Sequence, residues 1–201
     1  MGVAMCRWLA ENFPKLNPRR ILDMGCTVGH STTPYALAFP DAEIHAIDVA
    51  APVLRYAHAR AQSMGYGINF SQQDAERTNF DDASFDLVVS HILLHETSRR
   101  AVFNIMNESR RLLRSGGLAI HIEAPIQNDQ LTPLDAFSQD WATHYNAEPF
   151  WGTLHDMDLR QPLREAGFSE DEIIFDKAAK VFGGGAGLTG GGTWLLIGGR
   201  K

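Results

Sequence analysis

The sequence predicts an α/β fold: a doubly wound, seven-stranded sheet with helices on both faces and a C-terminal antiparallel hairpin. Short apolar runs alternate with helical patterns along most of the chain, which is typical of parallel strands covered by helices. A glycine-bearing turn follows the first apolar run. The last two strand-like runs have no helical pattern between them, which favours antiparallel pairing because no crossover helix joins them.

Composition limits the classes of protein to which the chain can belong. Its length of 201 residues predicts one domain over residues 1–201. A net charge of −6 argues against a nucleic-acid partner, and no apolar run approaches the roughly 20 residues that span a bilayer. Residues 1–10 lack the apolar core of a signal peptide. Two cysteines without a CxxC pair indicate neither a disulfide framework nor a zinc site, so we expect a cytoplasmic protein.

Five apolar runs are the candidate parallel strands, because each is short, rich in branched or aromatic residues and followed by turn residues. They are Arg20–Met24, Glu43–Asp48, Ile68–Gln72, Phe85–Ser90 and Leu118–Glu123. Helical patterns between them predict right-handed crossovers.

The predicted helices are 3–12, Ala51–Met64, Arg99–Leu113 and Asp156–Ala166. The second has Pro52 near its first position and ends before Gly65, as helices often do. The third precedes Ser115-Gly116-Gly117, which predicts a glycine C-cap.

The C-terminal part breaks the alternation. Glu172–Phe182 and Thr193–Gly198 both resemble strands, and Gly183–Gly192 between them contains seven glycines. A helix is improbable there because each glycine costs about 1 kcal/mol relative to alanine. The pattern predicts a long hairpin with a glycine-rich loop.

The segment Pro125–Gly152 is the other irregular part, and it is rich in aromatic residues. Two interpretations stay open: a small helix that packs aromatic side chains onto the domain, or a substrate-covering insertion at 125–152. Its place after the fifth strand favours the insertion, because ligands of such sheets bind outside the carboxyl ends of the strands.

A turn with two glycines follows the first strand and runs from Asp23 through Gly25 to Gly29, with a helical pattern from about His30. Glycine lets the backbone turn sharply and approach a ligand. The free N–H groups at the start of a following helix suit a nucleotide-like ligand. The turn is neither the GxxxxGK[ST] phosphate loop nor the G-x-G-x-x-G dinucleotide motif. An acid at Asp23 would repel a pyrophosphate and suits a cationic ligand.

Two more carboxylates stand at the ends of successive strands. Asp48 ends the second strand, where a carboxylate can accept hydrogen bonds from both ribose hydroxyls. Asp74 follows the third strand and could accept from the exocyclic amine of an adenine. The alternatives are a helix-terminal acid at Asp48 and a plain turn aspartate at Asp74. Three acids in this order, with the glycine turn after the first, favour a nucleoside site.

With these motifs, residues 18–125 resemble the class I S-adenosylmethionine-dependent methyltransferases, most closely the small-molecule, ubiquinone-biosynthesis-like branch (methyltransferase types 11 and 25). The family motif [DE]-x-G-x-G-x-G is matched by Asp23, Gly25 and Gly29. Thr27 replaces the middle glycine, and we expect it to narrow the loop.

Later motifs extend the resemblance. Phe85–Ser90 matches the fourth-strand motif, and Leu112–Leu118 matches the LLxPGG stretch with Ser115 in place of proline. The family's sheet is Rossmann-like and ends in an antiparallel hairpin. The resemblance therefore implies S-adenosyl-L-methionine as cofactor and S-adenosyl-L-homocysteine as product.

The resemblance also assigns roles to residues. It places Asp48 on the ribose, Val49 beside the adenine, and Asp74 with Ala75 at the adenine edge. The implied cofactor-binding residues are Asp23, Gly25, Cys26, Gly29, Asp48, Val49, Asp74, Ala75 and His91. Cys26 is interpreted as a small apolar residue of the loop, not a nucleophile.

Methyl transfer needs a dedicated base only when the acceptor must lose a proton. The resemblance places His91 at the methionine end of the cofactor through its backbone, and His95, one helical turn on, is the catalytic candidate. Pocket-lining histidines are one alternative. Two metal ligands at a spacing of four are the other, but no third ligand is evident and we expect no metal. His144 and Tyr145 are further acceptor-site candidates, whereas His121 is expected in the core.

We therefore expect S-adenosylmethionine-dependent methyl transfer to a small organic acceptor. The alternatives are a non-catalytic S-adenosylmethionine-binding domain or subunit of a complex, and a nicotinamide oxidoreductase on a similar sheet. Methyltransferases of this branch often carry several N-terminal helices that cap the acceptor site, and here one is predicted. Three arrangements stay open: an open acceptor site, one closed by residues 125–152, or one covered by the partner in a homodimer.

Overall fold

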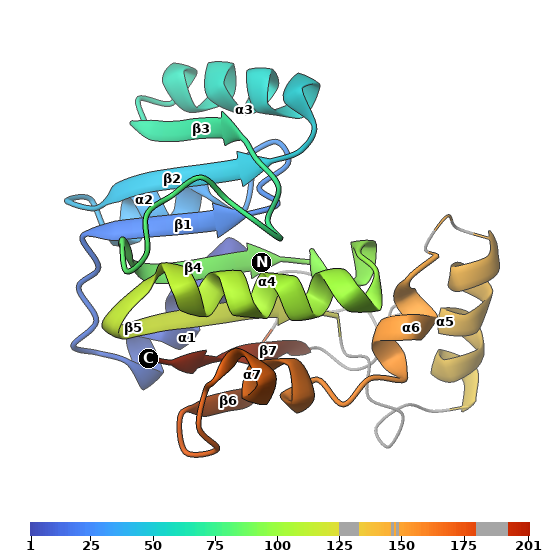
Figure 1. The fold of residues 1–201 in the computed structure, drawn as a ribbon. Coiled ribbons are helices and arrows are strands. Elements are labelled where there is room, and N and C mark those ends of the chain that lie inside the picture. The colour runs from blue at the N-terminus through green and yellow to red at the C-terminus, as the bar shows by residue number, and fades with distance from the viewer. Residues whose placement is uncertain (125–132, 146, 148, 180–192) are drawn as a thin grey trace.

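The computed structural model describes residues 1–124, 133–145, 147, 149–179 and 193–201. Its centre is a seven-stranded sheet of order β3-β2-β1-β4-β5-β7-β6 (Figure 1). The first five strands pair in parallel, and β7 runs antiparallel to both β5 and β6. The predicted fold class is therefore confirmed. The strands are β1 (Arg20–Met24), β2 (Glu43–Asp48), β3 (Ile68–Gln72), β4 (Phe85–His91), β5 (Leu113–Glu123), β6 (Ile173–Ala179) and β7 (Thr193–Arg200).

Helices cover both faces of the sheet (Figure 1). One apolar cluster packs α1, α2 and α3 against one face, and a second packs α4, α6 and α7 against the other. The two clusters make the sheet the centre of the core, so the strand ends are the places where polar side chains can gather. The helices are α1 (Gly2–Asn12), α2 (Thr33–Ala38), α3 (Ala51–Ser63), α4 (Arg99–Leu112), α5 (Pro133–Tyr145), α6 (Trp151–His155) and α7 (Arg160–Ala166), with a 3₁₀ turn, η1 (Leu94–Glu96).

The prediction that Ser115-Gly116-Gly117 caps the helix Arg99–Leu113 is wrong. Leu113 already has extended backbone, with φ −68° and ψ 137°, and the chain passes directly from α4 into β5. Gly116 has φ 80°, and the Lys201 N–H donates to the carbonyl of the next glycine at 2.9 Å. The glycines therefore lie within a strand, beside the end of β7, and do not end a helix.

The helix predicted near Asp156–Ala166 is also corrected, because α6 ends at His155 and α7 begins at Arg160. Asp158 lies in the break, and its carboxylate accepts a hydrogen bond from the Arg160 N–H at 3.0 Å. The predicted end at Ala166 is confirmed, and Gly167 follows in the left-handed conformation, with φ 96°.

Some sequence predictions fall outside the described residues. The glycine-rich loop expected over Gly183–Gly192 is one of them, and so is the first part of the segment 125–152. Of that segment, α5 and the start of α6 are described. In the described part of the chain, no helix is long and apolar enough to cross a membrane.

His121 is fully buried in β5, as expected for a core histidine. Its Nδ1 lies 2.8 Å from the Ser90 hydroxyl, and its Nε2 lies 3.4 Å from the Ser109 hydroxyl. Burial, with a smaller contribution from nearby His91, lowers the pKa of His121 to about 4 from the usual 6.5. The folded protein therefore holds this imidazole in its neutral form.

This burial predicts a pH-dependent stability. Between pH 6.5 and 4 the unfolded chain protonates His121 and the folded chain does not, so stability falls as the pH falls through that window. The free energy of unfolding, measured with urea at pH 7 and pH 5, should fall between these pH values in the wild type. In His121→Gln the fall should be smaller by about 2 kcal/mol. His58→Gln, at an exposed histidine of α3, should keep the wild-type difference. Equal losses for all three proteins, or an NMR titration of His121 with a normal midpoint, would contradict the argument.

Candidate cofactor and catalytic site

Two glycines shape the turn between β1 and α2. Gly25 has φ 69° and Gly29 has φ 70°, in the left-handed region that side chains with a Cβ rarely adopt. A Cβ on Gly25 would lie 2.7 Å from Leu93 Cδ1, and one on Gly29 would lie 3.3 Å from Phe70. The turn therefore needs glycine at both positions.

Thr27 takes the same left-handed backbone conformation, with φ 45°. This is unusual for a β-branched residue. Its side chain is exposed, and its N–H donates to Asp48 Oδ2 at 2.9 Å. The residue that departs from the glycine motif thus keeps a glycine-like backbone and joins the turn to the end of β2.

Asp48 lies at the carboxyl end of β2, next to the glycine turn. Its Oδ1 accepts from the Ala50 N–H at 2.9 Å, in addition to the Thr27 bond to Oδ2. Val49, which follows, exposes 63% of its surface. The end of β2 thus combines an anchored carboxylate with an exposed apolar side chain.

Asp74 and Ala75 follow β3 and lie at the next strand end along the sheet edge. Asp74 is exposed, and its Oδ1 accepts from the Glu76 N–H at 2.8 Å. Glu76 Oε2 in turn accepts from Asn104 Nδ2 of α4 at 2.7 Å. A hydrogen-bonded turn and a helix therefore hold the Asp74 carboxylate in place.

Asp23 is fully buried behind the glycine turn. Its Oδ2 accepts from the Thr32 hydroxyl at 2.6 Å, and its Oδ1 lies 3.3 Å from His91 Nδ1. His91 Nε2 lies 3.0 Å from the Tyr35 hydroxyl, which is buried in α2. This row of buried polar groups connects the end of β1 to the end of β4 and to α2. Asp23 therefore supports the glycine turn from the protein interior.

Cys26 is buried within the glycine turn. Burial, together with the negative charges of Asp23 and Asp48, raises the pKa of its thiol well above the usual value. The thiol therefore stays neutral, in agreement with the interpretation of Cys26 as a small apolar residue.

His95 forms a buried pair with Glu123, the last residue of β5. His95 Nδ1 lies 2.7 Å from Glu123 Oε2, and the other carboxylate oxygen accepts from the Leu94 N–H at 2.7 Å. His95 exposes 2% of its surface and Glu123 none. The Trp151 ring packs against the imidazole with 4.7 Å between ring centroids. The pair thus has a fixed orientation.

The sequence predicts His95 one helical turn after His91, which would put both on one helix face. In the structure the two histidines do not share a helix. His91 ends β4, Ile92 follows with φ 56°, and His95 lies in the 3₁₀ turn η1. The reversal at Ile92 separates the imidazoles, so that His91 lies beside Asp23, whereas His95 lies beside Glu123 and, at 3.5 Å from its Nε2, Glu96. Among the residues that the structure describes, no group of three His, Cys, Asp or Glu side chains has metal-site geometry.

The structure also places residues that sequence reasoning missed. Glu123 ends the fifth strand as Asp48 ends the second, so the pattern of acids at strand ends could have singled it out. Trp151 belongs to the aromatic segment 125–152 proposed as a substrate-covering insertion, but its contact with His95 had no sequence signal, because packing of α6 against η1 puts it there. His144 and Tyr145, the other acceptor-site candidates, lie on α5 with largely exposed side chains.

Residues 21–117 match the methyltransferase domain family. A malonyl-[acyl-carrier protein] O-methyltransferase of Methylococcus capsulatus is 34% identical over 103 residues, which cover 50% of this chain and 35% of that protein. A demethylmenaquinone methyltransferase of Thermus thermophilus is 30% identical over 108 residues, or 54% of this chain and 48% of the relative. The chain thus spans a third to a half of the length of these relatives.

A geranyl diphosphate methyltransferase solved in complex with S-adenosylmethionine has the same fold. It superposes with a TM-score of 0.67 over 98% of this chain and 84% of that one, at 13% identity. The family match covers the strands β1 to β4 and the glycine turn. Through residues 21–117 the chain therefore belongs to the class I S-adenosylmethionine-dependent methyltransferases.

Proposed function

We propose that this chain, as one domain over residues 1–201, transfers the methyl group of S-adenosylmethionine to a small organic acceptor that loses a proton in the reaction. The observation that carries the proposal is the buried His95–Glu123 pair at the edge of the sheet where the glycine turn lies. Membership of the methyltransferase family supports the cofactor, and the names of the two relatives support a small acceptor. Cys6 and Cys26 are both free thiols, which is typical of proteins in the reducing cytoplasm, and we place the protein there.

The side chains around the glycine turn fit this cofactor. A carboxylate has about four acceptor positions, and Asp48 uses two of them within the chain, which leaves room for the ribose hydroxyls. Exposed Val49 offers an apolar face to the adenine. The proposed cofactor-binding residues are Asp23, Gly25, Cys26, Gly29, Asp48, Val49, Asp74, Ala75 and His91. Among these, Asp23 and the His91 side chain act by holding the turn.

The chemistry assigns a proton-transfer role to His95. When bound, S-adenosylmethionine supplies a methyl group on a positively charged sulfur, ready for attack by the acceptor. Glu123 accepts the Nδ1 proton of His95, which makes Nε2 the basic nitrogen, and Nε2 lies 3.5 Å from Oε1 of the exposed Glu96 carboxylate. The carboxylate also stabilises the imidazolium that forms when His95 takes a proton from the acceptor. An acceptor hydroxyl or an acidic C–H group suits this arrangement.

Trp151 adds a hydrogen-bond donor beside the base. Within the described part of the chain, its indole N–H is buried and has no acceptor, and such a donor is costly to leave unpaired. Its ring contacts His95. We assign this N–H to an oxygen of the acceptor, which would hold the acceptor against the base.

Binding of the cofactor can be tested at Asp48. Calorimetry with S-adenosylmethionine and S-adenosylhomocysteine should show that Asp48→Ala weakens both affinities at least tenfold, because a charged hydrogen-bond acceptor is worth about 1.5 kcal/mol or more. Asp41→Ala, at an exposed aspartate in the turn before β2, is the matched control and should bind like the wild type. Wild-type protein that is folded yet binds neither compound would refute the proposed cofactor.

The base can be tested with a panel of small acceptors that carry acidic O–H or C–H groups, with methylated products detected by mass spectrometry. His95→Gln should lower turnover roughly 10²- to 10⁴-fold and remove the acidic limb of the pH–rate profile. Glu123→Gln should also lower turnover, and both variants should retain cofactor affinity. Unchanged turnover in His95→Gln would rule out the base. A wild type that binds the cofactor and methylates nothing would favour the non-catalytic alternative.

The strain at Thr27 is testable by unfolding. Thr27→Gly should raise stability by about 1 kcal/mol, because glycine adopts φ 45° without the cost that a Cβ brings. Thr27→Ala keeps the Cβ, so its free energy of unfolding should stay close to that of the wild type. The measurement is urea denaturation of the three proteins, and a Thr27→Gly variant less stable than the wild type would contradict the expectation.

A further inference from the structure

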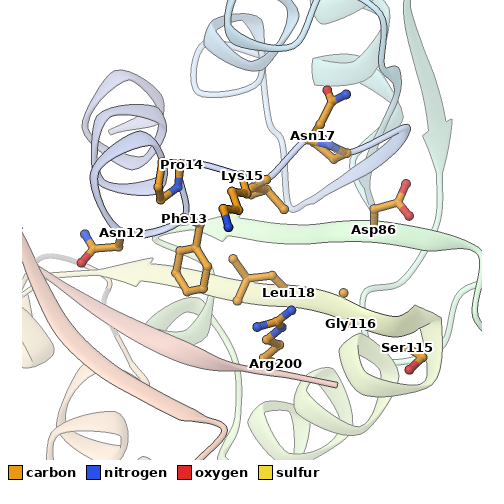
Figure 2. Close-up of a pocket in the computed structure, with 13 residues that line it drawn as sticks. Asn12, Phe13, Pro14, Lys15, Asn17, Asp86, Ser115, Gly116, Leu118 and Arg200 are labelled. Carbon is orange, nitrogen blue, oxygen red and sulfur yellow. The ribbon is translucent and has the colours of Figure 1, made fainter.

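A hollow lies at the opposite edge of the sheet from the glycine turn. It has a volume of about 450 Å³, within the range of small-molecule sites. Three segments line it: the loop between α1 and β1, the start of β5 and the end of β7, with Asp86 at the start of β4 (Figure 2). Asp86 and His91 lie five residues apart on β4, or about 17 Å at the usual rise of a strand. The hollow is therefore separate from the proposed methyl-transfer site.

Two cationic side chains line the hollow. Lys15 comes from the α1–β1 loop and Arg200 from the end of β7. In Figure 2 the Leu118 side chain lies between the Lys15 ammonium and the Arg200 guanidinium, with the Phe13 ring beside them. Both residues are exposed, and the structure as described gives neither side chain an ion pair.

Asp86, the acidic residue of the lining, is paired with other groups. Asp86 Oδ2 accepts from the Arg19 and Arg20 backbone N–H groups, both at 2.8 Å. Its Oδ1 pairs with Arg114 at 3.0 Å. The Asp86 carboxylate is thus engaged, and the lining keeps two positive charges on a chain whose net charge is −6.

The rest of the lining is apolar or neutral. Phe13, Leu16 and Leu118 provide the apolar surface, and Asn12 and Asn17 provide amide groups at the side. Leu118 is 1% exposed and forms part of the core beneath. A flat apolar group can pack on the Phe13 ring while the cations bind a charged end, since Arg and Lys both favour carboxylates and phosphates.

We propose that this hollow is a second binding site, for a small organic anion that joins a carboxylate or phosphate to a flat apolar body. Lys15 and Arg200 hold the anionic group, and the half-buried Phe13 and Leu16 contact the body. The site is independent of the proposed methyl transfer, because it shares no residue with the cofactor and catalytic residues. A bound anion would link the α1–β1 loop to the start of β5 and the end of β7.

The test is an NMR titration of ¹⁵N-labelled protein with phenyl phosphate, benzoate and neutral phenol. We expect phenyl phosphate or benzoate to shift the amide signals of Phe13, Gly116 and Arg200 with saturation in the millimolar range or below. The tighter of the two anions identifies the charged group. Phenol should bind at least tenfold more weakly, and saturating S-adenosylmethionine should leave the titration unchanged.

Variants make the test specific. Lys15→Gln and Arg200→Gln are exposed changes that should each weaken binding about five- to tenfold. Arg7→Gln, an exposed charge loss on α1 outside the hollow, should leave binding as in the wild type. No saturable shift by 20 mM ligand would overturn the proposal. So would shifts centred on Gly25 and Gly29, or an equal loss of binding in Arg7→Gln.

Discussion

Parallel pairing of β3, β2, β1, β4 and β5 brings the carboxyl ends of five consecutive strands to one edge of the sheet. Each of these ends carries or leads into a polar side chain proposed for the site, because in a parallel sheet residues distant in sequence come together there. Register adds detail: Asp23 pairs with Val89 of β4, and Ser90 pairs with His121 of β5. A shift of the strands would separate these groups, so the proposed site rests on the register of the sheet.

Burial of charge is the main cost of this arrangement. Asp23 and Glu123 are both fully buried, and an unpaired buried carboxylate would be strongly destabilising. Each instead bonds to a histidine and to a second donor, the Thr32 hydroxyl for Asp23 and the Leu94 N–H for Glu123. Such pairs add little net stability compared with apolar packing. Their value lies in fixing the orientation of the turn and of the imidazole, on which positioning of reactants depends.

Backbone strain collects in the same region. Thr27 and Ile92 are both β-branched residues with positive φ, and they lie in the loops that follow β1 and β4. Strain of this kind persists where the surrounding structure holds it, and it often marks a functional turn. At Thr27 the bond to Asp48 holds it, and at Ile92 the N–H donates to the Ile122 carbonyl at 2.8 Å. Neither feature follows from composition or periodicity.

The sequence by itself determined the strands β1 to β3 to the residue, the order of the strands along the chain, the glycine turn and the acids at the first three strand ends. These follow from local rules: apolar period, glycine conformation and the polarity of strand ends. The family motifs supported them, because their residues are contiguous in the chain.

Only the tertiary structure decided which distant residues meet. Pairing of Glu123 with His95, the contact with Trp151 and the separation of His91 from His95 depend on how β4, β5 and α6 pack, and no local pattern encodes such contacts. The glycines after α4 misled local reasoning for the same reason. Gly116 follows a helix in sequence, but its conformation is set by pairing with Lys201, the last residue of the chain described here.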